Sequence, residues 1–292
     1  MRRDLTIGPE PSRAAASWLA FALTLVGAAL RLGTLNTRSF WLDETTAVRQ
    51  ASWSIDVMLA WMAHNVHPPL FHTLLHYWIV EFGRSEVVVR IFAVTWGIAA
   101  IPLAYWAARA LYDRRVALLA AAIVALSPCF IWYAQEARMY TMMLVFALLS
   151  TGAMWRALDR RRAWWWLPYA LATGAGLMTQ YFFGFLVLGQ ACYILLGREH
   201  RRARPVLGWA ASLVVASLPL LWWLPKVFAH PELLRGATGA FNYGGTPPAV
   251  GVHFNELILV PVQWAFGFHS EIATRDLVAM WPLLITLVFL SS

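Results

Sequence analysis

"VVVRIFAVTWGIAAIPLAYWAAR", Val87–Arg109, is the stretch that decides how this chain folds. A transmembrane α-helix needs about 20 predominantly apolar residues. This run meets that length with one internal charge, Arg90, before the basic residue that closes it. The stretch therefore predicts a membrane-spanning helix with a single cation placed about one turn from its start.

Similar apolar runs recur along the chain, which is 60% hydrophobic and 13% charged. An ordinary soluble domain carries roughly 25% charged residues, so the composition predicts an all-α integral membrane protein, a polytopic helical bundle formed by the single module 1–292. The expected spans are about 14–33, 87–109, 116–133, 139–157, 164–179, 182–197, 206–224 and a partial 277–292. Because the last run is short, we expect a partial helix and a truncated chain.

The positive charge is arranged as an orientation signal, although a net charge of +8 can also suggest nucleic acid. Basic residues gather in short clusters between apolar runs, and cytoplasmic loops carry such clusters. The clusters precede 14–33 and lie between 87–109 and 116–133, between 139–157 and 164–179, and between 182–197 and 206–224. We therefore expect a cytoplasmic N-terminus and no nucleic-acid partner.

The segment 68–83 looks like a short membrane helix, but it is too short and carries His72, His76 and Glu81. If it crossed the membrane, every later basic cluster would lie outside. We interpret it as an amphipathic helix at the outer membrane face. Residues 34–86 then form one external loop, and residues 225–275 form another.

Two adjacent acids, Asp43 and Glu44, stand at the start of a helix-like pattern in the first external loop. The helix macrodipole favours carboxylates at that position, so both could be ordinary helix-start residues with Asp43 as the N-cap. Ionisable groups next to a membrane are also candidates for function. The pair alone does not decide between these readings.

The stretch "NVHPPLFH", Asn65–His72, places His67 just before a helix that the double proline starts. A cationic or neutral donor there could meet an anion at the helix N-terminus. His72 and His76 share one helical face, as zinc ligands do, or they are polar rings of an interfacial helix. Both alternatives stay open.

Charged and aromatic residues also follow the span 116–133. Tyr133, Glu136 and Tyr140 share a face if the segment is helical, and Arg138 is close enough in sequence to pair with Glu136. Arg90 is expected to face a partner or a cavity, unless it snorkels to the headgroups.

Gln180 and Tyr181, between two later spans, share the outer side with the two acids. Carboxylates, cations and polar groups thus converge on one membrane face. Arginine binds phosphate oxygens bidentately, and a carboxylate can accept the proton of an attacking hydroxyl. The set suits a lipid-linked phosphate substrate with a hydroxyl acceptor.

Four ordered motifs carry a family resemblance, and they are "WLDE" at 41–44, "HPPL" at 67–70, "GRSEVVVRIFAVTWG" at 83–97 and "ALSPCFIWYAQEARMY" at 125–140. They resemble the glycosyltransferase-C superfamily, in particular the bacterial branch of the dolichyl-phosphate-mannose-protein mannosyltransferase family, which also contains the aminoarabinose transferase acting on lipid A. The resemblance covers about residues 18–224.

The resemblance implies a fold of the glycosyltransferase-C type, with a large first external loop that carries juxtamembrane helices. It implies a polyprenyl-phosphate sugar donor, an inverting reaction and an active site on the external or periplasmic face of the plasma membrane. By resemblance, Asp43 is the general base and Glu44 completes its motif, while nothing excludes Glu44 as the base.

The resemblance also implies that donor-phosphate contacts come from His67, Arg90 and Arg138. The substrate cavity would include Glu136, Tyr133, Tyr140, Gln180 and Tyr181. It predicts no particular metal site, and a divalent cation stays open because some members use one and others do not. The sugar and the acceptor, whether lipid, protein or polysaccharide, are not implied.

Two other classes remain in view. A transporter or flippase of lipid-linked anions would need broken helices near the bilayer midplane and internal repeats. A membrane metalloenzyme would be built on His64, His67, His72 and His76.

Overall fold

The computed structural model describes residues 10–33, 35, 39–64, 67–160, 162–197 and 203–229. Within these ranges 84% of residues are helical and no strand occurs. The chain divides into two compact units, Met1–Leu126 with Phe130–Ala249, and Ser127–Cys129 with Val250–Ser292. The account below concerns the first unit. The predicted partial span 277–292 and most of the predicted loop 225–275 lie outside the described residues.

The described helices follow the apolar pattern of the sequence. They are α1 Arg13–Leu32, α2 Leu42–Ala51, α3 Ile55–Met62, α4 Leu70–Phe82, α5 Glu86–Leu111, α6 Arg114–Leu126, α7 Pro128–Ala134, α8 Tyr140–Arg160, the 3₁₀ turn η1 Ala163–Trp165, α9 Trp166–Thr179, α10 Phe183–Leu196 and α11 Ala203–Phe228. The all-α prediction is confirmed.

Four described helices, α1, α5, α8 and α11, are long and apolar enough to cross a membrane. A fifth span results if α6 and α7 count as one helix bent by 56°. The predicted single helix over 116–133 is therefore broken, at the residue before Pro128, where a proline disfavours helical backbone in its predecessor. At 14 residues each, α9 and α10 are shorter than the length that a straight span requires.

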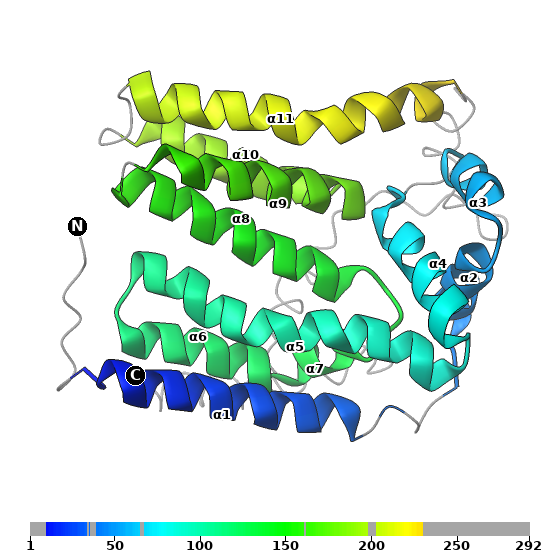
Figure 1. Cartoon of the computed structure of the whole chain (residues 1–292), viewed down its shortest axis with the longest axis horizontal. Helices are drawn as coiled ribbons and strands as arrows, with labels where there is room; N and C mark the ends of the chain where they lie inside the picture. The colour runs from blue at the N-terminus through cyan, green and yellow to red at the C-terminus, as the bar shows by residue number, and fades with distance from the viewer. Residues whose placement is uncertain are drawn as a thin grey trace, which may run out of the picture. The chain divides into compact units, whose positions relative to one another are not determined.

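The long helices pack side by side in a stack. The central helix α5 contacts α1, α6 and α8, while α8 contacts α9 and α9 contacts α11 (Figure 1). Small residues allow this close approach: a Cβ added at Gly174 of α9 would lie 2.9 Å from the Ala216 carbonyl oxygen of α11. Such interfaces are typical of membrane helices.

The three short helices α2, α3 and α4 gather at one end of this stack (Figure 1). There α2 packs on α4, and α4 packs on both α5 and α9. Phe71 and Leu75 of α4 are fully buried together with Val89 of α5 and Met142 of α8. This core fixes the short helices to the ends of the long ones.

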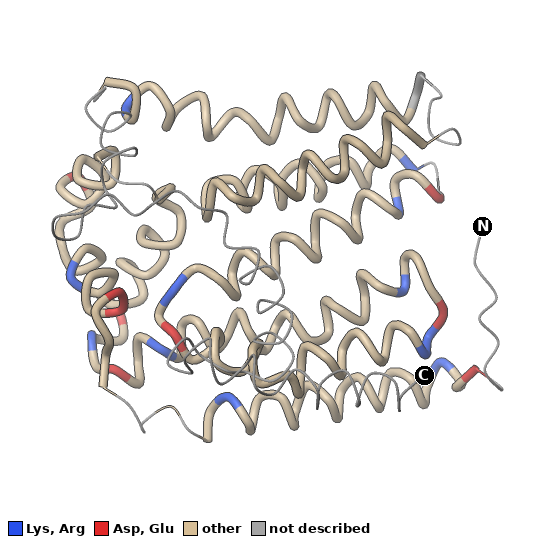
Figure 2. The backbone as a smooth tube through the Cα atoms, turned by 180° about the vertical axis from the view of Figure 1, so that it is seen from behind, with Lys and Arg blue, Asp and Glu red and all other residues tan. Residues whose placement is uncertain are grey.

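Charged residues concentrate near the two ends of the long helices and are sparse along their lengths (Figure 2). At the end opposite α2–α4, Arg114 Nη1 donates to Glu10 Oε2 at 3.0 Å. The start of α1 and the loop between α5 and α6 therefore lie at the same end, as the basic clusters predict for two loops on one side of a membrane.

Candidate active site

The site begins at the N-terminus of α2, where Leu42, Asp43 and Glu44 form the first turn. The N-cap is Trp41, so the alternative in which Asp43 caps the helix is wrong. Instead, Glu44 Oε2 accepts a hydrogen bond from the Trp41 backbone N–H at 3.4 Å. A glutamate at the third helical position commonly makes this contact in a capping box. This local contact holds the Glu44 side chain against the start of the helix.

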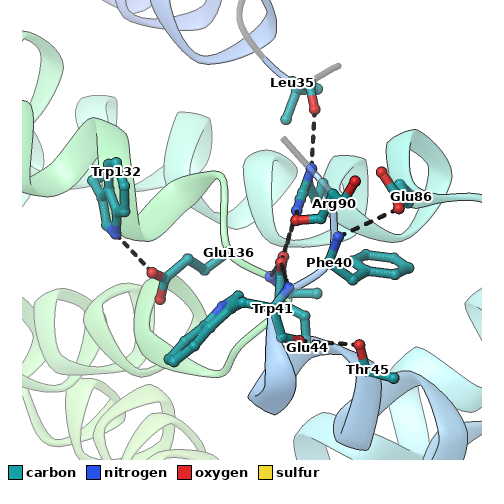
Figure 3. Close-up of polar contacts among 11 residues, drawn as sticks. Leu35, Phe40, Trp41, Glu44, Thr45, Glu86, Arg90, Trp132 and Glu136 are labelled. Carbon is teal, nitrogen blue, oxygen red and sulfur yellow. Dashed lines mark hydrogen bonds and ion pairs between the residues drawn. The ribbon is translucent and has the colours of Figure 1, made fainter. Parts of the chain in front are cut away.

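Glu44 forms a buried ion pair with Arg90 of α5 (Figure 3). Arg90 Nη2 donates to Glu44 Oε2 at 2.7 Å and Arg90 Nε donates to Glu44 Oε1 at 3.0 Å. The Glu44 side chain is 1% exposed and the Arg90 side chain is 5% exposed. Oε1 also accepts from the Ala137 N–H at 3.0 Å, so one carboxylate joins α2, α5 and the loop before α8.

The remaining contacts of Arg90 anchor the chain that precedes α2. Its Nη1 donates to the Leu35 carbonyl at 3.2 Å and its Nη2 to the Ser39 carbonyl at 3.1 Å, and the guanidinium lies over the Phe40 ring. These contacts occupy the side chain that the family pattern assigns to the donor phosphate. The phosphate role of Arg90 stays a prediction, and the snorkelling alternative is wrong because the side chain turns to Glu44.

Asp43, the neighbour of Glu44, faces a different environment. Its side chain is 42% exposed, and its Oδ2 lies 3.6 Å from Nη2 of Arg138, which is 13% exposed. Charged hydrogen bonds are typically 2.7–2.9 Å long, so this is a loose ion pair. Arg138 also lies over the Tyr140 ring at 5.8 Å. The half-exposed Asp43 carboxylate and the less exposed Arg138 guanidinium therefore lie next to each other.

Two histidines adjoin the Asp43–Arg138 pair. The His67 ring hydrogen-bonds to the Gln180 side chain, and both Arg138 and Asp43 act on it electrostatically. Burial lowers the pKa of His67, Arg138 lowers it further, and Gln180 and Asp43 oppose this. Burial also lowers the pKa of His72 to about 3, with further lowering from His67 and Arg138. Two neutral imidazoles thus border the pair.

Glu136 lies in the loop between α7 and α8, so the predicted helical face shared with Tyr133 and Tyr140 does not form. The two tyrosine rings nonetheless meet edge to face, with centroids 4.9 Å apart. Glu136 Oε1 accepts from Trp132 Nε1 at 2.7 Å (Figure 3). Burial raises the pKa of Glu136, the Trp132 bond lowers it, and the nearby Glu44 raises it.

Tyr181, the last predicted site residue, is oriented by Trp223 of α11. The indole N–H of Trp223 donates to the Tyr181 hydroxyl at 2.9 Å. The Tyr181 backbone N–H donates to Gln180 Oε1 at 3.0 Å, which fixes the Gln180 side chain beside His67. Both predicted cavity residues therefore hold the wall of the site.

The sequence did not reveal an apolar cavity of about 440 Å³. Its walls come from α3, α4, α9 and α11. They are Leu59, Pro69, Leu70, Thr73, Leu171, Gly174, Ala175, Met178, Pro219 and Trp222. Pro69 and Met178 are two residues from His67 and Gln180, respectively, so two of the cavity walls are close in sequence to residues of the polar site. Only the folded arrangement brings these walls together.

The histidine-based metal site is not assembled in the described part of the chain. His76 Nδ1 bonds to the Ala51 carbonyl at 2.8 Å, and His64 Nδ1 bonds to the Ala60 carbonyl at 2.8 Å. The described residues contain no group of three or more His, Cys, Asp or Glu side chains arranged to hold a metal ion.

Comparisons with known proteins agree with this architecture. The family model described as dolichyl-phosphate-mannose-protein mannosyltransferase matches residues 66–223. No curated protein sequence gives a significant match. Two solved structures share the fold and, like the chain, are of the predicted glycosyltransferase-C type.

One of these structures is the S. cerevisiae protein O-mannosyltransferase Pmt1–Pmt2 complex bound to the sugar donor, with 16% identity and a TM-score of 0.53. The other is the archaeal oligosaccharyltransferase AglB from Archaeoglobus fulgidus in complex with an inhibitory peptide and a dolichol-phosphate, with 15% identity and a TM-score of 0.57. The matches cover 80% and 94% of this chain, but in each case only 37% of the other.

Proposed function

This chain belongs to the dolichyl-phosphate-mannose-protein mannosyltransferase family, and from that premise we propose that it moves a sugar from a polyprenyl-phosphate donor to an acceptor hydroxyl. The observation that carries the proposal is the Asp43–Arg138 pair beside His67 and Gln180, together with an apolar cavity that has Pro69 and Met178 among its walls. A carboxylate, a cation and an apolar recess suit a hydroxyl, a phosphate and a prenyl chain, respectively.

Asp43 is the general base of this proposal. The acceptor oxygen attacks the anomeric carbon while the bond from that carbon to the phosphate oxygen breaks, and Asp43 takes the hydroxyl proton. Attack opposite the leaving group inverts the anomeric centre. We assign this role to Asp43 and not to Glu44 because the Glu44 oxygens accept hydrogen bonds from Arg90, Ala137 and Trp41 in a buried setting.

Arg138 neutralises the charge that develops on the polyprenyl phosphate as it leaves. Its loose contact with Asp43 lets the guanidinium turn toward a phosphate, with which arginine forms bidentate hydrogen bonds. His67, held by Gln180, supplies a second donor. Arg90 holds Glu44 in place, and so positions Asp43 on the same helical turn.

The prenyl chain occupies the cavity lined by α3, α4, α9 and α11. Apolar surface removed from water contributes roughly 25 cal/mol per Å², so the cavity adds affinity for the lipid without any polar contact. The cavity is lined in part by α3 and α4, whereas Arg109 and Arg114 at the α5–α6 loop lie at the other end of the stack. By the positive-inside rule this arrangement supports transfer on the external face, and we propose the plasma membrane as the location.

A transfer assay with purified protein tests the proposal. Polyprenyl-phosphate mannose, glucose and arabinose are supplied with lipid, peptide and polysaccharide acceptors, and product formation identifies the sugar and the acceptor. Asp43→Asn is expected to lower kcat about 10²- to 10⁴-fold, the usual contribution of a general base.

Asp56→Asn is the matched control, because Asp56 also occupies the second position of a short helix, α3, and is exposed. It is expected to leave transfer unchanged. Full activity in Asp43→Asn would refute the base assignment, and absence of transfer with every donor would refute the proposed function.

A further inference from the structure

Three buried nitrogen atoms near the active site have no hydrogen-bond partner. They are Nδ1 of His67, Nδ1 of His72 and Nε of Arg138. The three side chains are close enough for the charges of His67 and Arg138 to act on His72, and for the charge of Arg138 to act on His67. Three unpaired polar atoms thus gather in one place.

Such a cluster needs a physical explanation. More than 90% of buried polar groups in folded proteins are hydrogen-bonded, and each unsatisfied one costs about 1–3 kcal/mol. The histidines further along the same region are satisfied, since His64 and His76 bond to backbone carbonyls. Among these four histidines, the two with an unpaired buried nitrogen are therefore the two that lie beside Arg138.

His72 stands at the N-terminus of a helix, in the first turn of the 13-residue α4. Unpaired backbone N–H groups and the macrodipole favour an anion at this position. Its side chain is 4% exposed, and its partners on the other elements are the Arg138 guanidinium and the His67 ring. The unpaired Nδ1 therefore belongs to a side chain that lies beside one cation, Arg138, and one neutral imidazole, His67.

We propose that His72 is a phosphate-binding residue, which together with His67 and Arg138 receives one oxygen of the prenyl-linked phosphate. The inference deepens the proposed function and rests on it for the identity of the donor. In the tautomer that carries its hydrogen on Nδ1, His72 donates to the phosphate oxygen. The accessible side of Arg138, next to Asp43, gives the phosphate its approach.

A neutral imidazole suits this task. Burial and the neighbouring cations keep His72 uncharged at neutral pH. It can therefore add a hydrogen bond without placing a second positive charge beside Arg138. A hydrogen bond to a charged group contributes more to affinity than one between neutral groups.

Direct binding tests the inference without requiring transfer. A short prenyl monophosphate and the prenyl alcohol of the same length are titrated into the full chain in detergent at pH 8. His72→Phe keeps a ring but removes the nitrogens, and we expect it to weaken binding of the phosphate about tenfold or more. Binding of the alcohol is expected to stay unchanged.

Two further variants keep the test decisive. His72→Asn places an amide N–H near the position of Nδ1, and we expect it to recover most of the affinity even if His72→Phe unfolds. His76→Phe is the matched control, because His76 is four residues further on α4 and its ring bonds to the Ala51 carbonyl. It is expected to leave the phosphate-to-alcohol ratio unchanged.

The outcomes separate this inference from the proposed function. Equal phosphate binding by wild type, His72→Phe and His72→Asn overturns the inference and indicates that Nδ1 meets only water, even if sugar transfer is active. His72-dependent phosphate binding without transfer supports the inference and counts against the proposed reaction. A wild type that prefers the phosphate no more than the alcohol overturns both.

Discussion

Two carboxylate–guanidinium pairs lie side by side at the start of α2, and they differ in nearly every physical property. Glu44 and Arg90 are almost fully buried and joined by two hydrogen bonds of 2.7 and 3.0 Å. Asp43 and Arg138 are partly exposed and 3.6 Å apart. The same chemistry thus serves two purposes: the closed pair holds the site together, and the open pair is available to a substrate.

The difference follows from the additional hydrogen bonds that the carboxylate of each pair accepts. Glu44 receives the Ala137 and Trp41 N–H groups as well as Arg90, so its lone pairs are satisfied inside the protein. A buried ion pair is tolerated when such additional hydrogen bonds are present. Asp43 has no comparable set among the described residues, and its exposure leaves an oxygen free to take a proton.

Breaking the closed pair is expected to have the largest effect. Arg90→Leu leaves the Glu44 carboxylate buried without its cation, which typically costs about 3–5 kcal/mol in the free energy of unfolding. Thermal and denaturant unfolding in detergent measure this loss. Arg138→Leu, the equivalent change in the open pair, is expected to cost less, because Asp43 is 42% exposed and stays solvated when its cation is removed.

The opposite result would reassign the two arginines. If Arg90→Leu kept wild-type stability and only raised the KM of the donor, Arg90 would bind the phosphate, as the family pattern implies. The Glu44–Arg90 pair would then not be the contact that holds the site together.

Removing the cation from the open pair comes next. Arg138→Gln is expected to raise the donor KM about 10- to 100-fold, the range for a lost hydrogen bond to a charged group, while the unfolding transition stays nearly unchanged. Arg49→Gln, in the last turn of α2 and exposed, is the control and should alter neither quantity. A loss of stability equal to that of Arg90→Leu would show that the two pairs do not differ in purpose.

Most helices, and the polar residues that lie together at one end of the stack, could be predicted from the sequence, because apolar length and polar outliers are local properties. Which acid pairs with which arginine was not. Glu44 and Arg90 are 46 positions apart, and Glu44 and Ala137 are 93 apart. Asp43 and Glu44 differ by one carbon in the side chain and one position on a helix, and only the tertiary packing decides that one turns inward.

The break between α6 and α7 shows the same limit. Apolar composition predicts one continuous span over 116–133, and the bend of 56° becomes visible only in three dimensions. After the bend, α7 continues to Ala134, and Glu136 and Arg138 lie in the loop before α8. Pro128 is a local signal for this break, because a proline disfavours helical backbone in the residue before it.

The histidines beside the open pair extend the comparison to acid stability. The pKa of His72 is about 3 in the folded chain, below its ordinary value of 6.5. The unfolded chain therefore binds the proton first, so stability is present above pH 6.5 and is lost as the pH falls toward 3. Between pH 7 and pH 5 the loss from His72 amounts to about 2 kcal/mol.

Thermal unfolding across this pH range measures that effect. His72→Phe is expected to remove about 2 kcal/mol of the acid sensitivity, whereas His76→Phe should keep the wild-type dependence. Equal acid sensitivity in wild type and His72→Phe would mean that His72 becomes protonated in the folded chain, and that the neighbouring cations do not suppress its charge.

The smallest expected effect concerns the pH dependence of donor binding. His67 has a lowered pKa in the free protein because of burial and Arg138, while Asp43 and Gln180 act in the opposite direction. A bound phosphodiester, which carries one negative charge, favours the protonated ring and raises this pKa. Donor binding is therefore accompanied by proton uptake, and the donor KM is expected to increase as the pH rises from the lowered pKa of the free ring to its higher value in the complex.

A shift of one pKa unit corresponds to about a tenfold change in KM, measurable in initial rates at several donor concentrations between pH 5.5 and 8. His67→Lys keeps a positive charge over this range and is expected to flatten the dependence, whereas His64→Lys, outside the site, should keep it. If the lysine variant at 67 retained the wild-type slope, the titrating group would have to be another member of the open pair's surroundings. His67 and His72 would then act only as neutral hydrogen-bonding groups, and Arg138 alone would supply the positive charge that binds the phosphate.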